Sequence, residues 1–148
     1  MNSAKVPDPN VRRFVLGLPV LGLMWFAMSQ KQSPPLNIKE VGVEETKALV
    51  AAGALILDVR ERVQYEFRHL PGAILAPLSE LSKAIPAFLT QAIAKPILVY
   101  CGDGIAHGPE GTALLNRAGY AGAVNLKPGV EGWASAGLPL EHGKGRTS

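Results

Sequence analysis

The only cysteine of the chain, Cys101, stands where a reactive thiol could be exposed. The preceding residues, PILVY, have the composition of a buried strand, and the following stretch, GDGIAHG, contains three glycines. Because glycine has no Cβ atom, a glycine-rich chain can curl and turn its main-chain N–H groups inward. Such donors, with the positive end of a following helix, stabilise an anion such as a thiolate. The pattern predicts a nucleophilic cysteine; the alternative is a structural cysteine packed as a small hydrophobic residue.

The loop after this cysteine supplies the residues expected to contact a substrate or anion: Gly102, Asp103, Gly104, Ile105, Ala106, His107 and Gly108. An aspartate in a GDG turn favours an outward orientation, so we expect Asp103 to point away from the thiol. An inward carboxylate would instead repel an anionic substrate and oppose formation of the thiolate. His107 is either a solvated loop residue or a group that contacts an anion or transfers a proton.

Strand and helix patterns alternate along the globular part of the chain. Apolar runs predict strands at 54–59, 73–76, 96–101 and 122–126. Amphipathic stretches predict helices at 43–53, 62–70, 78–93, 108–120 and 129–137, with an interruption at Pro86. This alternation favours an α/β fold in which helices cover both faces of a mostly parallel sheet. Sites in such sheets lie beyond the carboxyl ends of the strands, which is where Cys101 stands.

The composition narrows the classes of function. A chain of 148 residues that is 47% hydrophobic and 18% charged can bury one core and carry an appendage. Its net charge of +3 is scattered, with no basic stripe, so we expect no nucleic-acid partner. The three histidines, His69, His107 and His142, lie far apart, and one cysteine cannot build a Cys-rich site. We therefore expect no bound metal and no intramolecular disulfide.

Residues Phe14 to Gln30 form an uncharged, apolar run near the N-terminus. As a helix these residues would span about 25 Å, slightly less than the roughly 30 Å of a bilayer's hydrocarbon core. The run predicts a single transmembrane helix. Its main rival is a cleaved signal peptide, because Ala27-Met28-Ser29 resembles a small-x-small cleavage site. A buried core helix fits less well, since the run has no polar face.

The predicted organisation has five parts. These are a cytoplasmic segment (1–13), the transmembrane helix or signal segment (14–30), a linker (31–37), the globular domain (38–141) and a flexible tail (142–148). Three basic residues precede the apolar run, Lys5, Arg12 and Arg13, and two follow it, Lys31 and Lys39. The positive-inside bias favours a globular domain outside the cytoplasm, which in a bacterium is the periplasm.

The globular part resembles the rhodanese family over three segments. LDVRERVQYEFRHLPGAI (57–74) is similar to the N-terminal signature of that family, and VYC with its glycine-rich loop, LLNRAGY and VNLKPGVEGWASAGLPL (124–140) follow in the family's order. The resemblance implies an open, five-stranded, mostly parallel sheet flanked by helices. It implies sulfur transfer through a persulfide on Cys101, with no cofactor. The implied partners are a small sulfur-containing donor or a protein persulfide, a thiol acceptor, and the membrane through the N-terminal helix.

The resemblance also implies supporting roles for four residues. Asp58 and Arg60 match the D-V-R positions, where an ion pair or hydrogen bond would hold the edge of the loop. His69 matches the histidine of the H-x-P-G turn, which it would support. Trp133, in EGW, would pack in the core or border the pocket.

Two departures from the family keep other functions open. Active members carry Arg or Lys in the loop, but this loop has none and contains Asp103 instead. The spacing C-x5-H-G-P also resembles the C-x5-R-G-P loop of rhodanese-fold dual-specificity phosphatases, with His107 replacing their arginine. Imidazolium lacks the bidentate fork of guanidinium. We therefore predict a membrane-tethered sulfurtransferase, with a non-catalytic binding or sulfur- and redox-sensing module as the alternative, and a phosphatase as a third.

Overall fold

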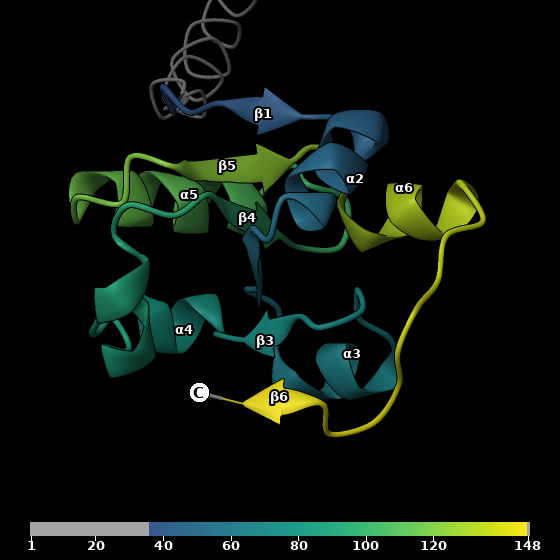
Figure 1. Ribbon diagram of the computed structural model, residues 1–148. Coiled ribbons are helices and arrows are strands. Elements are labelled where there is room, and N and C mark those ends of the chain that lie inside the picture. Colours follow the sequence, from purple (N-terminus) through teal and green to yellow (C-terminus); the bar gives the residue numbers. More distant parts are fainter. Residues whose placement is uncertain (1–35, 148) are drawn as a thin grey trace, which may run out of the picture. The chain divides into compact units, whose positions relative to one another are not determined.

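The computed structural model describes residues 36–147, which form one parallel β-sheet with helices on both sides (Figure 1). Six strands follow in the order β1-β5-β4-β2-β3-β6, and every neighbouring pair is parallel. Their bounds are β1 (Glu40–Val41), β2 (Leu55–Asp58), β3 (Ile74–Leu75), β4 (Ile97–Tyr100), β5 (Ala123–Leu126) and β6 (Arg146–Thr147). The α/β class and the parallel sheet predicted from the alternating patterns are confirmed.

The central strands β2 and β4 determine where the site forms. All four residues of β4 are buried, as expected of an apolar strand that is covered on both faces. In the parallel register Asp58 pairs with Tyr100, so the carboxyl ends of β2 and β4 lie level. The residues that follow them, Arg60 and Cys101, therefore leave the sheet at the same edge.

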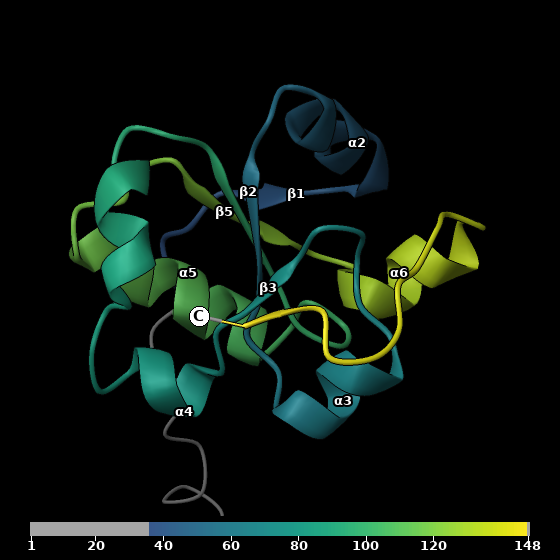
Figure 2. The same ribbon diagram turned by 60° about the horizontal axis from the view of Figure 1, so that its bottom comes forward.

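Two helical layers cover the sheet. The helices are α2 (Val43–Ala51), α3 (Arg62–Phe67), α4 (Leu78–Leu81), the 3₁₀ helix η1 (Ala87–Ala92), α5 (His107–Arg117) and α6 (Gly129–Ser135). Successive strand residues point to opposite faces. Tyr100 packs in the cluster that includes Trp133, whereas Val99 and Cys101 belong to the cluster that includes Leu115. Helices α2 and α6 belong to the first of these layers and α4 and α5 to the second, and Figures 1 and 2 show the two pairs apart.

The helix predicted at 78–93 is two shorter elements. Helix α4 ends at Leu81, and η1 begins after Pro86, which has an extended ψ of 141°. Proline has no N–H to donate and clashes with the preceding helical turn, so one continuous helix cannot pass through this position. The predicted interruption at Pro86 is confirmed.

The C-terminal residues correct two predictions. The sheet has a sixth strand beyond the expected five, and Arg146 of the segment 142–148, predicted as a flexible tail, begins it. Strand β6 pairs with the outer edge of β3, and the Arg146 N–H donates to the Tyr65 hydroxyl over 2.9 Å. The edge of the sheet offers unpaired main-chain groups to any nearby segment. The polar residues of this tail therefore give no sign in the sequence that they pair as a strand.

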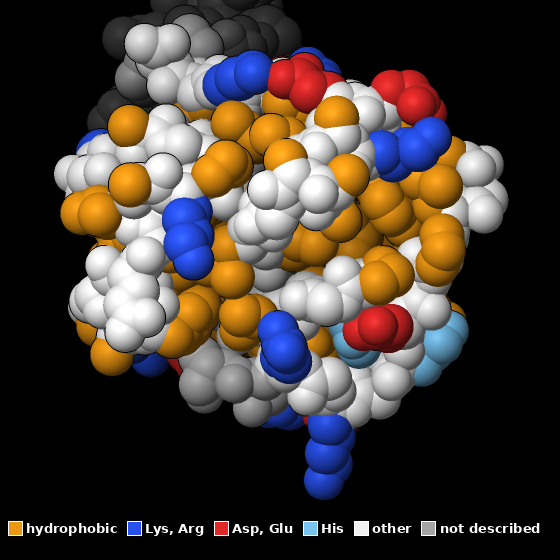
Figure 3. All heavy atoms as spheres, in the orientation of Figure 1, with side chains coloured by type: hydrophobic (Ala, Val, Ile, Leu, Met, Phe, Trp, Pro, Cys, Tyr) orange, Lys and Arg blue, Asp and Glu red, His pale blue; other side chains and the backbone are white. Residues whose placement is uncertain are grey.

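The predicted membrane span, residues 14–30, lies outside the described residues, as do segment 1–13 and most of the linker 31–37. Among residues 36–147, no helix combines the length and the apolar character that crossing a bilayer requires. Hydrophobic side chains nevertheless reach the surface over α2 and α6 (Figure 3). A small apolar pocket of about 80 Å³ lies in this region, lined by Val50, Ile56, Leu70, Pro71, Trp133 and Pro139.

Candidate active site

Cys101 follows β4 directly, and its side chain lines a pocket of about 340 Å³ although the residue is only 3% exposed. The pocket lies beyond the carboxyl ends of the central strands, as predicted for this class of sheet. Eight residues line it: Arg60, Gln64, Cys101, Gly102, Asp103, Ala106, His107 and Glu131. Four of the seven predicted loop residues are therefore at the pocket. Of the other three, Gly104 and Gly108 are buried, and Ile105 is 72% exposed.

The loop is held from α6 and β5. The N–H groups of Val130 and Glu131, at the start of α6, donate to the carbonyls of Cys101 and Gly102, each over 3.0 Å. The buried amide of Asn125 donates to the Gly104 carbonyl over 2.9 Å. These contacts come from segments more than twenty residues further along the chain, so the loop's shape depends on tertiary packing.

Glycine is required at Gly104 because its φ of +75° is rarely adopted by other residues and a Cβ atom would lie 1.7 Å from the Lys127 carbonyl oxygen. At Gly108 a Cβ atom would lie 2.3 Å from Asn125 Oδ1 and 3.3 Å from Cys101 Sγ. The glycines thus allow the loop to pack closely against β5 and against the sulfur. These two glycines allow the tight turn that the sequence predicts after Cys101.

Several main-chain donors of the loop have no acceptor among the described residues. This applies to the N–H groups of Gly102, Asp103, Gly104, Ala106, His107 and Gly108. Four of these residues, Gly102, Asp103, Ala106 and His107, line the pocket. The first turn of α5 begins at His107 and adds the positive end of the helix dipole. No N–H within residues 36–147 bonds Sγ itself, so the prediction that main-chain donors encircle the sulfur is wrong for the resting thiol.

The expected outward orientation of Asp103 is wrong. Its Oδ1 atom accepts a hydrogen bond from the Ile105 N–H over 2.9 Å and lies 3.7 Å from Cys101 Sγ, which donates to it. The turn formed by the Ile105 N–H holds the carboxylate beside the sulfur. The site therefore combines a nucleophile with a carboxylate that can accept its proton, and with a negative charge that opposes anionic ligands.

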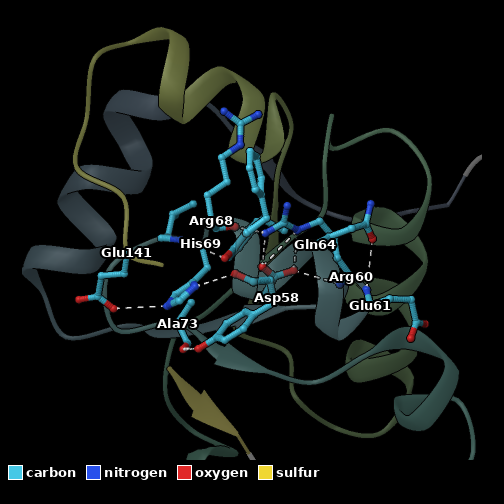
Figure 4. Close-up of polar contacts among 12 residues, drawn as sticks. Asp58, Arg60, Glu61, Gln64, Arg68, His69, Ala73 and Glu141 are labelled. Atoms are coloured by element: carbon cyan, nitrogen blue, oxygen red, sulfur yellow. Dashed lines mark hydrogen bonds and ion pairs between the residues drawn. The ribbon is translucent and has the colours of Figure 1, made fainter. Parts of the chain in front are cut away.

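Asp58 and Arg60 form a buried ion pair at the edge of the pocket (Figure 4). Arg60 Nη2 lies 2.6 Å from Asp58 Oδ2, Nε lies 2.9 Å from Oδ1, and Nη2 also donates to the Arg68 carbonyl. Burial by itself lowers the pKa of Arg60, but the hydrogen bonds and charge of Asp58 outweigh it and raise that pKa. The predicted internal ion pair is present, and it engages the Nε–Nη2 edge of the guanidinium.

Tyr100 lies under this ion pair and links it to the turn at residue 70. Its ring lies 5.6 Å from the Arg60 guanidinium carbon, and its hydroxyl accepts a hydrogen bond from the Leu70 N–H over 3.1 Å. Burial, and then the negative charge of Asp58, raise the pKa of Tyr100 well above its usual value. The hydroxyl is thus held in its neutral form.

His69 and Trp133 stand away from the pocket. The His69 ring is buried, stacks on Tyr65 with centroids 3.9 Å apart, and its Nδ1 donates to the Tyr65 carbonyl. Figure 4 shows its other edge facing Glu141, whose carboxylate lies 3.5 Å from Nε2. Trp133 donates from Nε1 to the Pro139 carbonyl and packs in the core. Neither residue lines the Cys101 pocket.

Three residues of the site were not predicted from the sequence. Gln64 and Glu131 line the pocket from α3 and α6, and Asn125 holds the loop from β5. A signal existed only for Asn125, a lone polar residue inside the apolar run AVNL. A buried amide in a strand needs hydrogen-bond partners, which indicates a position next to irregular backbone.

Comparison with known proteins agrees with this geometry. Residues 42–136 match the sequence model of the rhodanese-like domain. The Escherichia coli (strain K12) protein YibN, which is named as uncharacterized, is 30% identical over 141 residues, covering 90% of this chain and 98% of YibN.

Solved structures show the same fold. A thiosulfate sulfurtransferase from Pseudomonas aeruginosa matches with a TM-score of 0.65 and 34% identity, covering 74% of this chain and 21% of that chain. This protein therefore spans about a fifth of that larger molecule. The human single-domain sulfurtransferase TSTD1 matches with a TM-score of 0.56 and 30% identity, covering 65% of this chain and 95% of TSTD1. The fold, the position of the cysteine and these matches together place the chain in the rhodanese-like domain family.

Proposed function

We propose that this protein is a sulfurtransferase that carries sulfur as a persulfide on Cys101. The observation that supports this most directly is that Cys101 lines a pocket together with four loop residues whose N–H groups have no acceptor within residues 36–147. Such donors stabilise a terminal persulfide sulfur, which is an anion. Two matched structures are sulfurtransferases by name, which supports the same class of reaction.

The proposed reaction has two displacements. The Cys101 thiol loses its proton to Asp103, and the thiolate attacks the outer sulfur of the donor, whose sulfur–sulfur bond breaks. The donor leaves with the electron pair and takes up a proton if it is a thiolate. The acceptor thiol then releases its proton to solvent, and its thiolate attacks the outer sulfur of the Cys101 persulfide, whose S–S bond breaks. Cys101 leaves as a thiolate with the electron pair and takes up a proton from solvent.

Intact-mass spectrometry of the full-length chain tests this proposal. Incubation with sulfur donors should add one sulfur atom to the wild type and none to Cys101→Ser, and an added thiol should remove it. If no donor adds sulfur while iodoacetamide alkylates Cys101, the protein is a non-catalytic rhodanese-like module instead. That alternative is favoured by one observation, the absence of Lys and Arg from residues 102–108.

We also propose that residues 14–30 anchor the domain to a membrane and place it in the periplasm of a bacterium. One support is the uncharged run itself. The other is the match to YibN, which covers 90% of this chain and therefore extends beyond residues 36–148 into the N-terminal segment. Deletion of residues 14–30 should release the protein from the membrane fraction in alkaline carbonate. A full-length protein already in the soluble fraction would reject the anchor, and protection from protease in spheroplasts would reverse the orientation.

A further inference from the structure

The arginine side chains at and beside the pocket are already paired. Arg60 is the only Lys or Arg among the residues lining it, and its guanidinium is bonded to Asp58 and to the Arg68 carbonyl. Arg68 forms an ion pair with Glu131, which also lines the pocket. Among the residues that line the pocket, an incoming anion therefore meets no Lys or Arg side chain without a carboxylate partner.

Carboxylates border the path to the sulfur. Asp103 Oδ1 lies 3.7 Å from Sγ, and Glu131 lines the same pocket with a side chain that is 60% exposed. A donor that carries two negative charges beside its reactive sulfur would have to approach the Asp103 carboxylate, whereas the charge of Glu131 is balanced by Arg68. Repulsion scales with the charge of the donor, so a dianionic donor is disfavoured more than a monoanionic one. A donor with basic groups next to its reactive sulfur is favoured.

Exposed apolar side chains stand next in the chain to residues that line the pocket, on α3 and on the loop after Cys101. Val63 and Phe67, 81% and 71% exposed, are four residues apart on α3, so they share a helix face next to Gln64 of the pocket lining. Ile105, 72% exposed, lies between the pocket residues Asp103 and Ala106. A small inorganic donor cannot cover such side chains, whereas a polypeptide can bury them on docking.

We propose that the sulfur donor is a persulfidated cysteine on a polypeptide, flanked by basic and apolar residues, and that dianions such as thiosulfate are poor donors. This inference rests on the proposed sulfurtransferase function. Cys101 thiolate attacks the outer sulfur of the peptide persulfide, whose S–S bond breaks. The peptide thiolate leaves with the electron pair and takes the proton held by Asp103, so the step needs no oxidant or reductant.

Two synthetic peptides that differ only in charge test the proposal. Both carry one persulfidated cysteine next to leucine, one flanked by lysines and the other by glutamates. At low ionic strength the lysine peptide should load sulfur on full-length protein about tenfold faster or more, and salt should reduce the difference. Equal loading rates for the two peptides overturn the proposal. If neither peptide nor thiosulfate adds sulfur to Cys101, the sulfurtransferase function itself fails.

Variants separate the charge from the apolar rim. Asp103→Asn keeps an oxygen for the Ile105 N–H but removes the proton acceptor of Cys101, so the rate of loading from thiosulfate is divided by the rate of alkylation with neutral iodoacetamide. This ratio should rise about fivefold or more in the variant. Phe67→Ser should lower loading from the lysine peptide about fivefold, with loading from free cysteine persulfide unchanged. Ile93→Ser, at an apolar residue that is 55% exposed and not part of the pocket, is the matched control. An Asp103→Asn protein whose thiosulfate-to-iodoacetamide rate ratio equals that of the wild type, or a Phe67→Ser protein equal to the control, contradicts the inference.

Discussion

The Cys101 thiol donates a hydrogen bond to the Asp103 carboxylate, with Sγ and Oδ1 3.7 Å apart. The same oxygen accepts the Ile105 N–H, so the turn keeps the carboxylate beside the sulfur. This arrangement gives the nucleophile a proton acceptor and places one negative charge beside it. The reactivity of Cys101 should therefore depend on the charge of the reagent.

Alkylation measures this dependence directly. Iodoacetate is negatively charged and iodoacetamide is neutral. The ratio of their alkylation rates at Cys101, iodoacetate over iodoacetamide, should be lower in the wild type than in Asp103→Asn. A residual repulsion of about 1 kcal/mol after solvent screening corresponds to a change of about fivefold in the ratio of the two rates. The neutral reagent corrects for any change in thiolate population. Equal rate ratios in the two proteins would contradict an inward negative charge.

The Asp58–Arg60 ion pair should be essential for stability. Asp58→Asn leaves the Arg60 charge buried with weaker partners, so the free energy of unfolding should fall by about 3–5 kcal/mol. Urea denaturation measures this loss. The double variant Asp58→Asn, Arg60→Gln removes both charges and should recover part of the stability. A loss below about 1 kcal/mol in the single variant would show that the buried pair contributes little.

Two glycines of the same loop should respond differently to alanine. At Gly104 a Cβ atom meets the Lys127 carbonyl and φ is +75°, so Gly104→Ala should cost at least about 2 kcal/mol of unfolding free energy. At Gly102 nothing lies within 4 Å of a Cβ atom, so Gly102→Ala should change stability by less than about 1 kcal/mol. Thermal or urea denaturation of the pair tests the loop packing, and equal costs would contradict it.

Tyr100 should make the fold sensitive to alkali. Its pKa is raised in the folded protein by burial and by the charge of Asp58, so the folded state holds the phenolic proton more tightly than the unfolded chain. This contribution to stability is complete below about pH 10 and is lost as the pH rises toward the raised pKa.

The variant Tyr100→Phe should lose this alkaline component. It should be less stable at neutral pH by about 1–3 kcal/mol, because the buried Leu70 N–H loses its acceptor. Between about pH 9 and about pH 11, however, its free energy of unfolding should fall less steeply than that of the wild type. Urea denaturation at several pH values provides both slopes, and parallel slopes would exclude Tyr100 as the titrating group.

Local patterns predicted most of the framework. The apolar runs 54–59, 96–101 and 122–126 contain β2, β4 and β5, because parallel strands covered on both faces need continuous hydrophobic residues. The short strand β6 was missed because its two residues carry no apolar pattern and pair only through main-chain groups at the edge of β3. A sheet edge recruits such a segment by its unpaired N–H and C=O groups.

The sequence by itself determined the α/β alternation and the position of Cys101 after a buried strand, since each depends on residues close together in the chain. The contact of Asp58 with Arg60 was implied by the resemblance to the rhodanese family, and the structure shows it as an ion pair. Only the tertiary structure decided that Asp103 faces the sulfur and that Glu131 of α6 lines the same pocket. The physical reason is that a glycine-rich loop has many accessible conformations. Its shape is selected by distant contacts, from Asn125, Lys127 and the start of α6, which no local pattern contains.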